Sequence, residues 1–150
     1  MSTKEERLRD QQTSNIMIED ICGDNESAKE YIYILGDVLR TWDDIQDQDY
    51  PVTREQILKA FKELFILLPA NTFFQEHRDL LLSQHLSMYN AWVASNEWEH
   101  GDEIDKMYAH VWKHACHELV PIMAYILQGC DKMEETSSLL RKLFKAKLGD

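Results

Sequence analysis

The chain has 150 residues, 44% of them hydrophobic and 29% charged, a balance that predicts one globular domain and excludes a fibrous or wholly disordered protein. Its 27 acidic residues outnumber 16 lysines and arginines, and the net charge of −11 excludes nonspecific binding to nucleic acid. Three cysteines without CxxC spacing, a start without an apolar signal segment and the lack of a long apolar run predict a reduced, cytoplasmic protein that is neither secreted nor inserted into a membrane.

The sequence predicts an all-α fold, because glycine and proline are rare and no alternating strand pattern is present. A first helix is expected over residues 4–22, with residues 1–14 polar enough to fray. A glycine turn separates it from a second helix over residues 26–48, which a Tyr-Pro pair ends. The second helix carries one apolar stripe at spacings of three and four: Tyr31, Leu35, Val38, Trp42 and Ile45.

Two capping-box patterns predict the third and fourth helices. Thr53 with Gln56 starts a third helix that runs to a proline, and Thr72 with Gln75 starts a long fourth helix to about residue 100. The third helix is expected to bury a stripe consisting of Ile57, Phe61, Leu64, Phe65 and Leu68.

The last two helices are predicted over residues 102–128 and 131–148, and Pro121 is expected to kink or divide the first of them. The expected apolar register of that helix is Ile104, Tyr108, Val111, Ala115, Leu119, Ile122 and Ile126. Short connections between long helices favour antiparallel neighbours. The sequence therefore predicts one all-α domain over residues 1–150, a compact bundle of five or six helices that are largely antiparallel or orthogonal.

An aspartate cluster lies where the second predicted helix ends: Asp43, Asp44, Asp47 and Asp49. The i, i+4 spacing puts Asp43 and Asp47 on one helix face with Asp44 beside them, and carboxylate oxygens are the ligands that Mg²⁺ prefers. Acids at a helix C-terminus also oppose the helix dipole, each at a cost of about 0.3 to 1 kcal/mol. A cation, a partner's lysines, or solvent and salt are the candidates to offset this cost.

The segment Asp43-Asp44-Ile45-Gln46-Asp47 resembles the DDxxD motif of class I isoprenoid synthases. In that family the motif lies near a helix end and holds Mg²⁺ against a substrate diphosphate. The resemblance covers these five residues, and the second metal motif of the family is not found in this sequence. It implies that Asp43, Asp44 and Asp47 are metal ligands.

A second acidic set surrounds the glycine at residue 101: Glu99, Asp102 and Asp105. Small helical nucleotide pyrophosphatases of the MazG and all-α dUTPase classes hold Mg²⁺ on paired acidic helices, and this chain is similar to them in class rather than in sequence. These three acids are therefore the candidates to face the aspartate cluster across a metal site.

Two further candidate sites lie on the fourth and fifth predicted helices. Glu103, His110, His114 and His117 fall on one side of the fifth helix, and helical histidines at i, i+4 can chelate Zn²⁺ or a redox metal. A solvated or partner-facing row of histidines is the alternative. On the fourth helix the polar members of a buried stripe predict either hydrogen-bonded core residues or a pocket bordered by His85, Tyr89 and Trp92.

Two functions of different class follow. The first is a non-enzymatic cytoplasmic interaction module that binds a protein partner, a basic one if the acidic charge directs binding. The second is a Mg²⁺-dependent enzyme that acts on a diphosphate or nucleotide through Asp43, Asp44 and Asp47, with Mg²⁺ as its only expected cofactor. Self-association as a homo-oligomer, through the first or last helix, is a further expectation.

Overall fold

The computed structural model describes residues 3–148, and within this range it contains helices and no strand, which confirms the predicted all-α fold. The chain divides into two compact units, Met1–Arg78 and Asp79–Asp150. Each unit is described by itself below. Among the described residues, none of the helices is long and apolar enough to cross a membrane.

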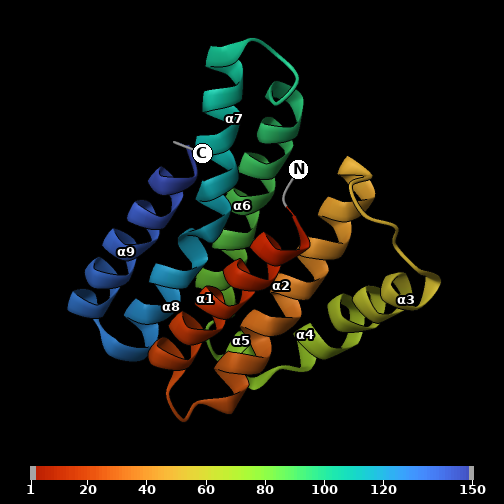
Figure 1. The fold of residues 1–150 in the computed structure, drawn as a ribbon. Helices are drawn as coiled ribbons and strands as arrows, with labels where there is room; N and C mark the ends of the chain where they lie inside the picture. Colours follow the sequence, from red (N-terminus) through yellow and green to blue (C-terminus); the bar gives the residue numbers. More distant parts are fainter. Residues whose placement is uncertain (1–2, 149–150) are drawn as a thin grey trace. The chain divides into compact units, whose positions relative to one another are not determined.

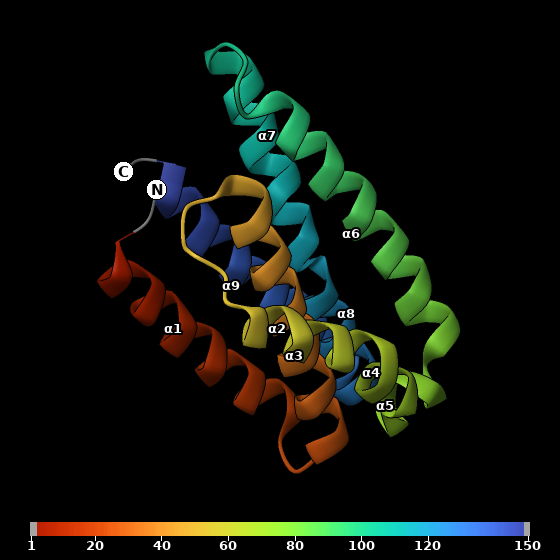
Figure 2. The same cartoon turned by 90° about the vertical axis from the view of Figure 1, so that its right-hand side faces the viewer.

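The first unit begins with an α-helical hairpin, in which α1 and α2 lie side by side (Figures 1 and 2). The hydroxyl of Thr3 accepts from the backbone N–H of Glu6 in a capping box, so α1 is already helical within the segment expected to fray. Gly23, at φ 54°, ends α1 in a conformation that a side chain would strain. The two helices are Lys4–Cys22 (α1) and Glu26–Asp47 (α2).

Four short helical segments complete the first unit, and the predicted capping box of Thr53 with Gln56 starts them. Figure 1 shows α3 meeting α2 near α4 and separating from it toward the loop of residues 48–53. The predicted cap at Thr72 is wrong by one residue, because the side-chain oxygen of Asn71, Oδ1, accepts from Phe74 N–H and makes Asn71 the N-cap. The segments are Arg54–Lys62 (α3), the π-helical Glu63–Leu67 (η1), Leu68–Ala70 (α4) and Thr72–Glu76 (α5).

The core of the first unit centres on aromatic packing between α2 and α5. Tyr31 is fully buried, and its ring lies 5.5 Å from that of Phe73 and 6.1 Å from that of Phe74. Two hydrogen bonds between α2 and the start of α5 lie beside these rings. The side-chain nitrogen of Asn71 donates to the backbone carbonyl of Ser27 at 2.9 Å, and the Ser27 hydroxyl accepts from Phe73 N–H at 2.8 Å. Buried polar groups that are satisfied in this way fix one helix against another.

The long helix predicted from residue 72 to about residue 100 is interrupted at His77, where φ is −119° and ψ is 23°. The His77 ring packs against Phe73 at 4.9 Å, one turn back. Beyond the break, α6 and α7 connect through the predicted turn at Gly101 and diverge away from it (Figures 1 and 2). The remaining helices are Arg78–Trp98 (α6), Glu103–Ala115 (α7), Cys116–Glu118 (η2, a 3₁₀ turn), Leu119–Gln128 (α8) and Cys130–Leu148 (α9).

The predicted interruption near Pro121 is confirmed, since η2 separates α7 from α8 just before this proline. Proline has no N–H and its ring crowds the carbonyl four residues earlier, which here is that of His117. Gly129, at φ 94°, then allows the turn that lays α9 along α8 (Figure 2). The buried side chains of this unit include Leu81, Met88, Leu119, Met123, Thr136 and Leu140.

The apolar register predicted for residues 102–128 is only partly buried. Leu119 is buried as expected, whereas Ile104, Tyr108 and Val111 are each more than half exposed. Aromatic contacts replace part of this burial, because the Trp98 ring packs against Trp112 at 4.8 Å and against Tyr108 at 5.9 Å. Edge-to-face aromatic pairs tolerate partial exposure while still joining two helices.

Candidate functional site

An apolar face on α3 and η1 is the largest departure from the predicted core. Within residues 57–67, seven large apolar residues are between 36% and 70% exposed, and Phe65 is the most exposed of them. The rings of Phe61 and Phe65 stack on each other at 5.3 Å, with 11° between their planes. We call this surface the α3–η1 apolar face: Ile57, Leu58, Phe61, Leu64, Phe65, Ile66 and Leu67.

The stripe predicted to be buried on the third helix is therefore on the outside, with the exception of its last member, Leu68. The side of the helix that turns inward carries Ala60 and Glu63, which are 3% and 4% exposed. An amphipathic helix ordinarily buries its apolar side. Here Ala60 and Glu63 are on the side that packs, and the large apolar side chains are not covered by the rest of the first unit.

An ionic cluster holds α3 and η1 to α2 in this orientation. The Lys59 ammonium donates to the Asp37 carboxylate at 2.7 Å and lies 3.4 Å from the Glu63 carboxylate, one turn along. Glu63 is a member of η1 and Asp37 belongs to α2, so the cluster joins the two elements. The second Glu63 carboxylate oxygen is buried and lacks a hydrogen-bond partner among the described residues.

The pKa values of the two carboxyls in this cluster are shifted in opposite directions. Burial raises the pKa of Asp37, but hydrogen bonds from Lys59 and Glu63 outweigh it, so the pKa of Asp37 lies below its usual value. Burial, the hydrogen bond to Asp37 and repulsion by its charge raise the pKa of Glu63. Glu63 is thus the carboxyl that holds a proton more readily, and the cluster links η1 to α2 with Glu63 buried and Lys59 largely exposed.

The π-helical geometry of η1 has a local cause in the sequence. Pro69 has no N–H to donate to the carbonyl of Phe65, and its ring crowds that carbonyl. The backbone instead widens by one residue, and the N–H of Leu68 donates to the carbonyl of Glu63, five residues earlier. Single π turns of this kind are frequent at functional sites. The π turn of η1 is therefore a second reason to consider the α3–η1 apolar face as a functional surface.

The aspartate cluster at the end of α2 has a basic neighbour that the sequence spacing did not reveal. The guanidinium of Arg7, on α1, pairs with the carboxylate of Asp44, whose side chain is 12% exposed. The same guanidinium lies 3.7 Å from the centre of the Tyr50 ring. Arg7 therefore supplies part of the charge that the sequence expected from a cation, and Asp43 and Asp47 make further interactions.

A metal role for the aspartate cluster stays a prediction. Within residues 3–148 the structure brings together no group of three or more histidine, cysteine, aspartate or glutamate side chains suited to a metal ion. The candidate opposing acids have local roles in their own unit. Asp102 caps α7, Asp105 completes that capping box, and Glu99 lies 3.3 Å from His100.

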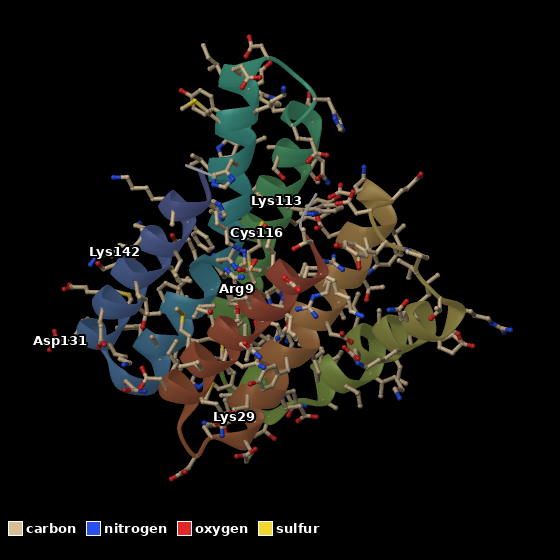
Figure 3. The ribbon with its side chains drawn as sticks, viewed as in Figure 1. Arg9, Lys29, Lys113, Cys116, Asp131 and Lys142 are labelled. Atoms are coloured by element: carbon tan, nitrogen blue, oxygen red, sulfur yellow. The ribbon has the colours of Figure 1, made fainter. Side chains whose placement is uncertain are left out.

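The histidine row of α7 is brought together in part. The Nε2 atoms of His110 and His114 lie 2.6 Å apart, and the His114 ring stacks on Phe144 of α9 at 3.8 Å. His117, on η2, lies farther away, 6.1 Å between ring centres from His114, and Glu103 pairs with a lysine one turn along its own helix. Figure 3 labels Lys113 and Cys116, which lie on the same α7–η2 segment.

His114 should remain neutral at neutral pH. Burial lowers its pKa to about 3, and the nearby charges of His110, His117, Lys147 and Lys113 act in the same direction. In the unfolded chain the His114 imidazole has a pKa of about 6.5, so as the pH falls it binds a proton before the folded protein does. The contribution of His114 to stability is therefore present above pH 6.5 and is lost as the pH falls toward 3.

We therefore expect wild-type protein to lose about 1 to 2 kcal/mol more of its free energy of unfolding than His114→Gln between pH 7 and pH 5. Urea unfolding at both pH values measures this difference. His100→Gln is the matched control, because the His100 side chain is 85% exposed. Parallel pH dependence in the wild type and His114→Gln would contradict the assignment.

The pocket predicted on the fourth helix lies on α6, but its three residues differ in environment. Tyr89 is 63% exposed, Trp92 is half-buried, and burial lowers the pKa of His85. A groove of about 670 Å³ lies instead between α8 and α9, lined by residues such as Ile122, Met133 and Lys142, the last of which is labelled in Figure 3. This groove could not be predicted from the sequence, because its lining comes from two helices. Hydrophobic periodicity does not specify how two helices pack against each other.

Exposed large apolar side chains also occur on α6 and α7, but the α3–η1 apolar face is the one that carries two stacked phenylalanines and a π turn. Its only sequence signal was the i, i+4 pair of Lys59 and Glu63, which shows that this side of the helix is suited to an ionic contact. No protein-family model, curated protein sequence or solved structure matches this chain.

Proposed function

We propose that this chain is a non-enzymatic protein–protein interaction module and that the α3–η1 apolar face is its docking surface. The observation that carries the proposal is the exposure of seven large apolar residues within residues 57–67. Contiguous apolar patches of this size are uncommon on monomers and mark interaction sites. Cys22, Cys116 and Cys130 form no disulfide among the described residues, which suits a reducing compartment such as the cytoplasm.

The side chains and local charge of the α3–η1 apolar face indicate what kind of surface its partner presents. Two stacked phenylalanines at the centre are typical of the anchors that carry most binding energy. The exposed charges beside them are Arg54, Glu55, Lys59 and Lys62, so this part of the surface does not share the acidity of the whole chain. The partner is therefore expected to present an apolar surface, and the basic partner suggested by the net charge is not favoured at this face.

A photo-crosslinking amino acid at position 65, in cells that make the protein, tests the docking surface. We expect one discrete adduct whose cross-link maps to a defined apolar segment of the partner and which Phe61→Glu removes. The same crosslinker at position 16 is the control, because Ile16 is 73% exposed but lies on α1. Equal labelling from both positions, or none from position 65, would refute the docking surface.

A further inference from the structure

We infer that the occupant of the α3–η1 apolar face is a second copy of this chain. The inference rests on the docking surface proposed above and names its partner. A two-fold axis would place the face against itself, so that each copy supplies the cover that the other lacks. Three properties of the face support a second copy over other occupants: its area, its charge and its geometry.

The area is that of a stable dimer. At about 200 Å² for a large apolar residue, seven residues that are on average half exposed present roughly 700 Å². Two such faces would remove up to about 1,400 Å² from water, which lies within the roughly 1,200 to 2,000 Å² of specific protein interfaces. Full cover of the face by a second copy would therefore give an interface of ordinary size.

The charge permits two copies to approach at this face. The chain carries −11, so most pairs of surfaces would repel each other. On and directly beneath the α3–η1 apolar face, three basic residues balance three acidic ones: Arg54, Lys59 and Lys62 against Asp37, Glu55 and Glu63. A surface with no net charge adds no local repulsion when it meets an identical surface, whereas an anionic lipid or a basic protein would find no complementary field there.

The geometry makes the face rigid before it binds. The buried Ala60 and Glu63 hold the inward side of the helix, the ion pair of Lys59 with Asp37 adds a contact to α2, and Pro69 lies at the end of η1. The stacked rings of Phe61 and Phe65 are therefore presented in one arrangement on both copies. A preformed surface loses less side-chain entropy on association, which favours a stable homodimer.

Sedimentation velocity of the full chain, from about 1 to 200 µM, tests the second copy. We expect the wild type to sediment as a dimer, and Phe65→Asp to weaken association at least tenfold, because it places a charge at the centre of the interface. Ile16→Asp is the matched control and should remain dimeric. Circular dichroism should show equal helicity in all three proteins, so that loss of the dimer is not loss of the fold.

Each other outcome overturns the inference. A wild type that is monomeric at 200 µM excludes the second copy; the docking surface then survives only if position 65 cross-links specifically to a different protein. A dimer that resists Phe65→Asp places the interface elsewhere. A monomer that co-sediments with anionic phospholipid vesicles, and loses them on Phe65→Asp, assigns the face to lipid and removes the docking proposal as well.

Discussion

Phe73→Ala is expected to lower the free energy of unfolding by about 3 to 5 kcal/mol. Phe73 is 1% exposed and lies between the rings of Tyr31 and His77, at 5.5 and 4.9 Å. Alanine would leave a cavity where α5 packs on α2, and rigid helical neighbours relax only partly into such a space. Urea unfolding followed by circular dichroism measures the loss.

Phe65→Ala is the matched control for this prediction, since it makes the same chemical change at a residue that is 70% exposed. At a protein concentration where the chain is monomeric, it should change the free energy of unfolding by less than about 0.5 kcal/mol. Similar losses in the two variants would mean that burial in the first unit is not organised around Phe73.

Asn71→Ala is expected to lower the free energy of unfolding by about 2 to 3 kcal/mol. The side-chain oxygen of Asn71 caps α5 by accepting from Phe74 N–H, and its amide nitrogen donates to the carbonyl of Ser27 and to Glu30, at 2.9 and 3.3 Å. The residue is 4% exposed, so the groups that alanine abandons cannot all turn to water.

Asn25→Ala separates the two contributions of Asn71. Asn25 has the same cap role at the start of α2, where its oxygen accepts from Ala28 N–H at 2.9 Å, but it is exposed. Asn25→Ala should therefore cost only about 1 kcal/mol. If Asn71→Ala costs no more than Asn25→Ala in the same unfolding experiment, the bonds from Asn71 to α2 contribute nothing.

The helix boundaries were largely predictable because their signals are local. The capping box at Thr53 and the glycines at the ends of α1 and α8 act within one turn of the backbone, so their spacing suffices. The break at His77 has no such signal. Neither glycine nor proline marks it, and helix-forming residues lie on both sides.

The orientation of the third helix could not be predicted, because periodicity locates an apolar stripe without saying what faces it. The ionic contact from Lys59 to Asp37 crosses more than twenty residues and turns the other side inward. The basic neighbour of the aspartate cluster could not be predicted for the same reason. Its balancing charge, Arg7, lies on a helix whose pairing the local spacing of Asp44 does not encode.

The π turn of η1 also has a consequence for how the length of this chain can change. Deleting one residue within Glu63–Leu67 would return the segment to α-helical geometry. Because the wide turn already accommodates the extra residue, α3 would keep nearly its present rotation relative to the α4–α5 segment, whereas the same deletion within the regular turns of α3 would rotate the residues before it by roughly 100°. A one-residue deletion in η1 is therefore expected to leave both the Asn71 hydrogen bonds and the direction of the apolar face in place.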